Sequence, residues 1–140
     1  MEIIGEKEII MKTIKVVAAV IQAGDRTLAT KRGYGDLINK WEFPGGKIKE
    51  GEKPKDALKR EIEEELRAEI VVHDLITTVE YDYPDFHLSM QCFLCELPGG
   101  KFELIEHKDA KWLHKDELKE LDWCPADVEV VDVILKKFSS

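Results

Sequence analysis

A run of acidic residues at helical spacing is the part of this sequence best suited to chemistry. Glu61, Glu64 and Glu65 lie three and four residues apart, and side chains at those spacings meet on one helix face. Glu63 is expected to point the opposite way, to solvent. Three carboxylates on one face repel each other unless something neutralises them, and a hard cation such as Mg²⁺ takes oxygen ligands. The run therefore predicts a helix that binds magnesium along one face.

The residues around the run distinguish this prediction from a commoner explanation. Acidic runs on helices are usually solvated faces. A solvated face requires neither the glycine pair at 45–46, nor Arg60 directly before the run, nor Glu52 eight residues before that arginine. Because all three features occur together, we favour a metal-binding helix behind a glycine-rich entry loop.

The stretch from Gly45 to Ala68 resembles the Nudix box, G-x5-E-x7-R-E-U-x-E-E-x-G-U, in which U is aliphatic. The residues that match in register are Gly46, Glu52, Arg60, Glu61, Ile62, Glu64 and Glu65. One position departs from the pattern, because Arg67 stands where the box has a glycine. A glycine there suits a left-handed helix C-cap, so a left-handed Arg67 would cost roughly 1–2 kcal/mol.

The resemblance to the Nudix hydrolase family implies a set of metal ligands and catalytic residues. The implied ion is Mg²⁺, for which Mn²⁺ is expected to substitute, and the implied ligands are the Gly45 carbonyl, Glu61, Glu64, Glu65 and Glu106. Glu106 is placed by counting back from Trp112, and a surface loop glutamate is the alternative. Arg60 is expected to pair with Glu52 and to hold the ligands in place. The general base stays open between Glu61 and Glu106.

The resemblance extends over Thr13–Phe138 and is closest to the MutT and CTP pyrophosphohydrolase branch, through the segments WEFPGGK, EYDYPDFH and PAD. That branch implies six substrate-binding residues, which are Arg32, Glu42, Phe43, Tyr83, Phe86 and Asp127. From the residue types alone, a purely structural role is the simpler alternative for several of them. Arg32 could close a surface hairpin, aromatic rings on strands are more often core, and Asp127 could cap the last helix.

The resemblance implies that Asp127 is the base-reading position, where MutT enzymes that act on 8-oxo-dGTP carry asparagine. A carboxylate only accepts hydrogen bonds, which suits the amino group of cytosine, and Phe86 replaces an arginine of the MutT pattern. We therefore expect a nucleoside triphosphate to be hydrolysed to the monophosphate and pyrophosphate, with CTP or dCTP preferred. The alternative is an 8-oxo-dGTP diphosphatase that sanitises the nucleotide pool in DNA repair. A Nudix-fold binding module without catalysis is less favoured, because every metal-binding position is filled.

Hydrophobic periodicity predicts the elements that must position these residues. Strands are expected over residues 12–22, 26–31, 69–81, 86–97 and 111–113, and helices over residues 54–67, 115–121 and 126–138. The last helix should turn toward the core Val128, Val131, Ile134 and Leu135. Strands with separated helices favour an α/β protein with a mixed sheet, and the resemblance implies the Nudix fold, an α/β/α sandwich.

Composition limits the remaining possibilities. A chain of 140 residues with 44% hydrophobic and 36% charged residues predicts one globular domain, here residues 12–140, after an N-terminal extension (1–11) of weak order. The net charge of −8 argues against a nucleic-acid polymer as partner, but not against a nucleotide whose phosphates meet a metal. No segment suits a membrane span or secretory signal, so we expect a cytoplasmic location. For the assembly we expect a monomer or a homodimer.

The three cysteines are expected to be reduced thiols without zinc or redox chemistry. Cys92 and Cys95 form C-x-x-C inside a strand-like run. An offset of three residues in a strand places the two side chains on opposite faces. Cys124 stands alone in the sequence.

Overall fold

The computed structural model describes residues 2–4 and 8–138. Its main sheet contains the strands β3 (Lys12–Ala23), β4 (Arg26–Lys31), β5 (Trp41–Glu42), β6 (Gly45–Lys47), β7 (Val71–Asp82), β8 (Phe86–Glu96) and β9 (Asp109–His114). The strand order is β5-β4-β3-β8-β7, with β6 paired to β3 and β9 paired to β4. β3 and β8 are parallel, whereas the other pairs are antiparallel. The predicted mixed sheet is therefore confirmed.

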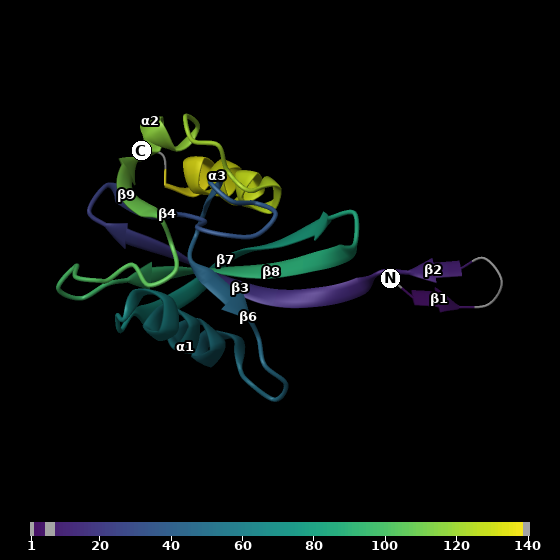
Figure 1. The fold of residues 1–140 in the computed structure, drawn as a ribbon. Helices are drawn as coiled ribbons and strands as arrows, with labels where there is room; N and C mark the ends of the chain where they lie inside the picture. Colours follow the sequence, from purple (N-terminus) through teal and green to yellow (C-terminus); the bar gives the residue numbers. More distant parts are fainter. Residues whose placement is uncertain (1, 5–7, 139–140) are drawn as a thin grey trace.

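Helices cover both faces of this sheet (Figure 1). α1 (Pro54–Leu66) lies on one face, and α2 (Lys115–Leu118) and α3 (Pro125–Lys137) lie on the other. The α1 side buries a cluster that includes Leu58, Ile62 and Leu66. The α3 side buries a second cluster that includes Trp41 and Phe43. Two cores on the two faces of one sheet make the expected α/β/α sandwich.

The inward face of α3 differs from the expected one at a single position. Val128 is 47% exposed, whereas Val130 is fully buried together with Val131 and Ile134. Residues 130, 131 and 134 fall on one stripe of a helix with 3.6 residues per turn, and residue 128 falls well outside it. The prediction that Val128 faces the core was wrong, because several overlapping apolar stripes exist in this valine-rich helix and tertiary packing selects one.

The end of α1 takes the conformation that the missing glycine would favour. Arg67 is the C-cap residue, with φ 47° and ψ 48°, and its backbone N–H donates to the Glu63 carbonyl at 3.0 Å. A non-glycine side chain in the left-handed region strains the backbone. The helix therefore keeps the cap geometry of the box pattern while carrying a residue that suits it less.

Replacement of Arg67 by glycine is expected to raise the free energy of unfolding by about 1 kcal/mol, because glycine adopts this conformation without a Cβ clash. The lost ion pair with Glu103 is long, at 4.0 Å, and highly exposed, so it contributes little. Urea unfolding measures the change. Arg67→Ala is the matched control, since it loses the same ion pair but keeps Cβ. A glycine variant no more stable than the alanine variant would contradict the prediction.

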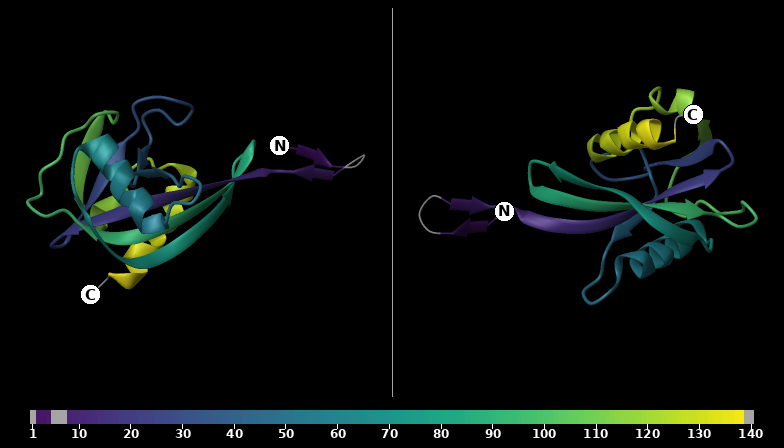
Figure 2. Two further views of the ribbon diagram at one scale, coloured as in Figure 1. Left: turned by 90° about the horizontal axis from the view of Figure 1, so that it is seen from below. Right: turned by 180° about the vertical axis from the view of Figure 1, so that it is seen from behind.

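A separate two-stranded sheet precedes β3. β1 (Glu2–Ile4) and β2 (Glu8–Ile10) pair in antiparallel fashion and project away from the main body (Figure 2). Residues 1 and 5–7 of the expected extension lie outside the described residues, and its weak order stays a prediction. Over the part of the chain that the structure describes, no helix is long and apolar enough to cross a bilayer.

The three cysteines are free and buried. Cys92 belongs to the core on the α3 side, and Cys95 belongs to the core on the α1 side. The two thiols therefore lie on opposite faces of the sheet, as the strand period predicts. Burial raises the pKa of both Cys95 and Cys124 to about 12, so these residues are thiols at neutral pH.

Candidate active site

The two glycines before α1 are required by two close approaches. A Cβ on Gly45 would overlap the backbone carbonyl of Val17 in β3, and a Cβ on Gly46 would overlap the carboxyl group of Glu61. Only glycine leaves room for both contacts. β6 therefore lies in close contact with β3 on one side and with the acidic face of α1 on the other.

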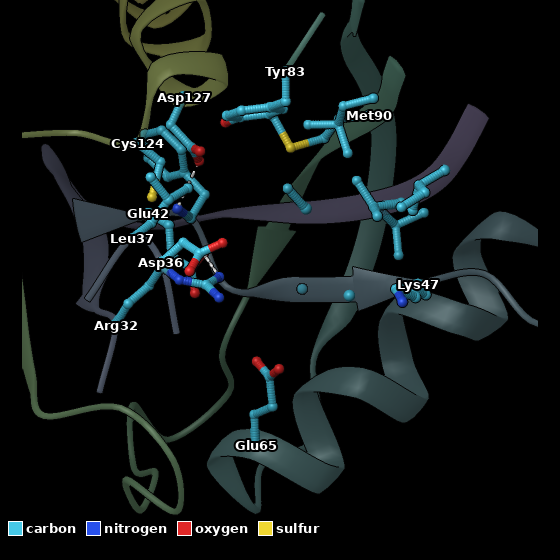
Figure 3. Close-up of a pocket in the computed structure, with 18 of the residues that line it drawn as sticks. Arg32, Asp36, Leu37, Glu42, Lys47, Glu65, Tyr83, Met90, Cys124 and Asp127 are labelled. Atoms are coloured by element: carbon cyan, nitrogen blue, oxygen red, sulfur yellow. Dashed lines mark hydrogen bonds and ion pairs between the residues drawn. The ribbon is translucent and has the colours of Figure 1, made fainter. Parts of the chain in front are cut away.

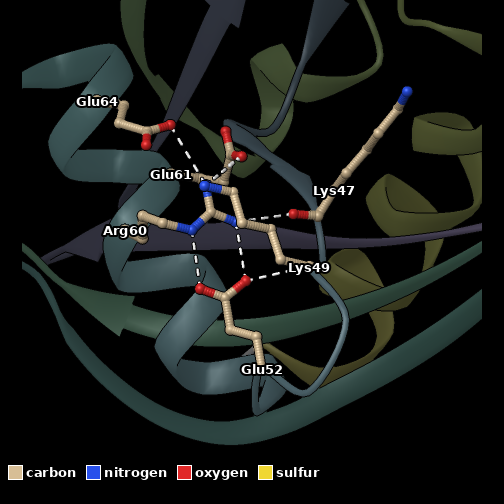
Figure 4. A network of polar contacts seen from close by, with 6 residues as sticks. All are labelled: Lys47, Lys49, Glu52, Arg60, Glu61 and Glu64. Atoms are coloured by element: carbon tan, nitrogen blue, oxygen red, sulfur yellow. Dashed lines mark hydrogen bonds and ion pairs between the residues drawn. The ribbon is translucent and has the colours of Figure 1, made fainter.

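Arg60 forms the centre of a charged network on this face (Figure 4). Its Nε and Nη2 donate to the two carboxylate oxygens of Glu52 at 2.8 and 2.9 Å, so the expected pairing is present. Its Nη1 donates to Glu61 at 2.8 Å and to Glu64 at 3.3 Å, and Nη2 also reaches the Lys47 carbonyl at 2.9 Å. The Arg60 hydrogen bonds, with one from a backbone N–H, lower the pKa of Glu52 to about 2.

A single large pocket brings together most of the predicted site. It has a volume of about 650 Å³ and opens beside β6 and the end of α1 (Figure 3). All six predicted substrate-binding residues line it, and so do three of the five predicted metal ligands. These nine residues are Arg32, Glu42, Phe43, Gly45, Glu65, Tyr83, Phe86, Glu106 and Asp127.

The acidic end of the pocket suits a hard cation. Glu65 points into the pocket (Figure 3), and its Oε2 is buried without a hydrogen-bond partner. Burial, followed by the charges of Glu42, Glu61 and Glu106, raises the pKa of Glu65 to about 8. Glu106 accepts a hydrogen bond from the Tyr34 hydroxyl at 3.2 Å. An unpartnered buried oxygen among like charges is a place where a divalent cation with oxygen ligands would be stabilised.

The predicted ligands do not all converge in this structure. Among the described residues, no group of three or more His, Cys, Asp or Glu side chains is arranged to hold a metal. Glu61 and Glu64 both accept hydrogen bonds from Arg60, whereas Glu65 faces the pocket. The guanidinium thus neutralises two of the carboxylates, and the ligand set stays a prediction.

The opposite end of the pocket is aromatic and apolar. Tyr83 and Phe86 stack with ring centroids 5.1 Å apart, and both are only partly buried. Phe43 is 3% exposed and stacks on Trp123 at 4.7 Å, so it serves as core and as pocket wall together. Flat apolar walls of this kind suit the faces of a nucleobase.

Asp127 lies at this end and does not cap α3. The N-cap residue is Cys124, and no side-chain hydrogen bond caps the helix. Instead, Oδ1 of Asp127 accepts from the Phe43 backbone N–H at 3.0 Å. Burial raises the pKa of Asp127 to about 8, so the side chain is mostly protonated at neutral pH. A protonated carboxyl donates as well as accepts, much as an amide does.

Replacement of Asp127 by asparagine is expected to flatten the pH dependence of stability. A carboxyl with a pKa near 8 in the folded state and about 3.9 when unfolded binds more protons when folded. Its contribution is complete below the unfolded pKa and is lost as the pH rises through the folded pKa. Asparagine does not ionise, so the variant should lose less stability on going from about pH 5 to about pH 9.

Urea midpoints measured across this pH range, in a chelating buffer, test the expectation. Asp132→Asn on the exposed side of the same helix is the matched control, and its profile should follow that of the wild type. Identical slopes for the wild type and Asp127→Asn would show that Asp127 does not titrate in this range.

His107 is a polar pocket residue that the sequence analysis did not identify. Nη1 of Arg32 donates to Oε1 of Glu42 at 3.0 Å, and Nε2 of His107 lies 2.9 Å from Oε2 of the same carboxylate. His107 also lines the pocket. It directly follows Glu106, but a lone histidine carries no informative spacing, and only the pairing of β9 with β4 brings it to Glu42.

Comparisons with known proteins agree with this fold. The NUDIX domain family model matches residues 11–134. The chain is 31% identical to an 8-oxo-dGTP diphosphatase of Escherichia coli K12, over 86% of this chain and 95% of that protein. It is 28% identical to a CTP pyrophosphohydrolase of the same strain, over 89% of this chain and 93% of that protein. The solution structure of a MutT protein from methicillin-resistant Staphylococcus aureus 252 superposes with a TM-score of 0.74 at 35% sequence identity. The match covers 91% of this chain and 99% of that chain.

The chain therefore belongs to the Nudix family. Within that family it is a hydrolase of the MutT type.

Proposed function

We propose that this protein hydrolyses nucleoside triphosphates to the monophosphate and pyrophosphate with the help of Mg²⁺. The observation that supports this best is the polarity of the pocket. Glu65 lies at one end, where Glu106 is among the charges that act on it, and Asp127 lies at the other end beside Tyr83 (Figure 3). A triphosphate bound with its base at the apolar end would extend its phosphates toward the carboxylates. The volume of about 650 Å³ is typical of small-molecule sites.

Each part of the chain would have a separate task in this reaction. Arg60 would hold the box carboxylates, and Arg32 would bind a phosphate or base oxygen. A bound Mg²⁺ would lower the pKa of water and stabilise charge at the phosphorus under attack. Glu61 and Glu106 are the candidates for accepting the proton of that water.

Two substrates have comparable support, and we propose cytosine nucleotides, CTP or dCTP, first. In its ionised form Asp127 would accept a hydrogen bond from the amino group of cytosine, and Phe86 stands where the MutT pattern has an arginine. The second candidate is 8-oxo-dGTP. It is favoured by the relative named 8-oxo-dGTP diphosphatase and by the raised pKa of Asp127, since the protonated form resembles an asparagine side chain. A cytoplasmic location and a small-molecule substrate, rather than a nucleic-acid or membrane partner, complete the proposal.

A panel of CTP, dCTP, 5-methyl-dCTP and 8-oxo-dGTP, compared by kcat/KM in the presence of Mg²⁺, tests both candidates. The cytosine proposal requires one of the first three to exceed 8-oxo-dGTP, and the reverse order would select the second candidate. Pyrophosphate should be the released product, and chelation by EDTA should abolish turnover, with Mn²⁺ restoring it. Failure to hydrolyse any nucleotide would favour a binding module.

A further inference from the structure

Three partly buried residues form a chain of contacts along one wall of the pocket, which we call the wall relay: Arg32, Glu42 and His107. The carboxylate of Glu42 lies in the middle, and each of its oxygens has a partner, Arg32 at 3.0 Å and His107 at 2.9 Å. Exposure falls along the relay, from 33% for the Arg32 side chain through 18% for Glu42 to 5% for His107. His107 is therefore the innermost member, and Arg32 is the member that a ligand would meet first.

The chemistry of the relay fixes the direction of its hydrogen bonds. Glu42 forms an ion pair with Arg32, and because a carboxylate only accepts hydrogen bonds, Nε2 of His107 is the donor in their contact. Burial acts to lower the pKa of Arg32, but the Glu42 carboxylate outweighs it and the pKa is raised. The guanidinium is therefore charged, and its Nε is buried without a partner. Its contact with Glu42 uses Nη1, which leaves other donors of the fork for a ligand.

The sheet explains why these three residues meet. Arg32 directly follows β4, and β5, which carries Glu42, pairs with β4 along one edge. β9 pairs with the other edge of β4, and His107 lies two residues before β9. His107 also directly follows Glu106, which lies at the acidic end of the pocket. The wall relay thus connects the two edges of β4 at the point where its end reaches the pocket.

We propose that His107 is a positioning residue, which fixes the Glu42 carboxylate and through it the orientation of the Arg32 guanidinium toward the substrate. This inference rests on the proposed nucleotide hydrolysis but not on which base is preferred. Without the imidazole, Glu42 would lose one of its two side-chain donors and Arg32 would gain freedom. Because an oriented guanidinium binds the substrate and the transition state alike, the loss should appear mainly in KM.

His107→Leu is expected to raise KM about tenfold, the lower end of what loss of a supporting hydrogen bond causes. The value of kcat should stay within about threefold. His107→Gln keeps an N–H donor near the position of Nε2 and should restore most of the wild-type KM. The assay uses the nucleotide with the highest kcat/KM in the panel. The matched control is His73→Leu, which removes an imidazole contact with Glu96 at 3.4 Å outside the pocket and should leave KM unchanged.

A second measurement needs no substrate. The Nε–H of Arg32 is buried, so its hydrogen exchange, followed by ¹⁵N-edited NMR, should be slow in the wild type. Exchange should accelerate in His107→Leu but not in His107→Gln or His73→Leu. Wild-type KM in His107→Leu would overturn the proposal. The proposal would also be overturned if His107→Leu and His107→Gln raised KM and lowered thermal stability by equal amounts, since that pattern indicates a packing effect alone. A wild type that hydrolyses no nucleotide would refute the proposed function. Unchanged exchange of the Arg32 Nε–H in His107→Leu would separately refute the role of His107 as a positioning residue.

Discussion

Glu64→Gln and Glu65→Gln are each expected to lower kcat by about 10²–10⁴-fold. This is the typical fall in rate when a group that acts directly on the reaction is removed. Both carboxylates lie on the face of α1 that meets the entry loop, and Glu65 also lines the pocket. Glutamine keeps the shape of the side chain and removes the charge that a divalent cation requires. Steady-state hydrolysis of the best nucleotide of the panel measures the loss.

The fold should survive both changes. Glu65 has a pKa of about 8 in the metal-free protein because burial and neighbouring carboxylates oppose its charge, so an uncharged glutamine there should leave thermal stability equal or higher. Glu63→Gln is the matched control, since it makes the same change of charge at an exposed position of the same helix. Near-normal kcat in both the Glu64 and Glu65 variants would refute their assignment as ligands.

Arg60→Lys should lower kcat/KM by about 10- to 100-fold, as loss of an outer partner of a metal site does. The guanidinium contacts Glu52 through two nitrogens and also reaches Glu61 and Glu64. An ammonium group carries the same charge but cannot reproduce this forked geometry. The three carboxylates would then no longer be held in a fixed arrangement.

The same variant should change the titration of Glu52. The hydrogen bonds from Arg60 are the main cause of the low pKa of that carboxyl, so NMR titration should find it nearer its ordinary value. Arg26→Lys is the control and should leave activity unchanged, since this exposed guanidinium lies outside the pocket and makes only a hydrogen bond of 3.4 Å to the Trp112 carbonyl and a contact of 4.0 Å with Glu117. Retention of full activity by Arg60→Lys would show that charge alone, without the fork, suffices.

The elements that carry local patterns were predicted well. The helix was expected over residues 54–67 and spans Pro54–Leu66, with a proline in its first turn and a left-handed Arg67 at its end. β4 spans Arg26–Lys31, the residues expected of it. These features depend on neighbours within one or two turns, so the order of residues contains the information. The short strands β5 and β6 were not foreseen, because two or three residues are too few to show a period.

The sequence by itself determined the family, the acidic helix and the pairing of Arg60 with Glu52. Spacings of three, four and eight residues are set by the geometry of one helix and the loop before it. The tertiary structure alone decided that Val128 faces solvent, that Asp127 is buried beside the Phe43 backbone, and that His107 stands behind Glu42. Burial and hydrogen bonds between strands distant in the chain create these environments, and no local pattern of residue types encodes which distant groups will meet.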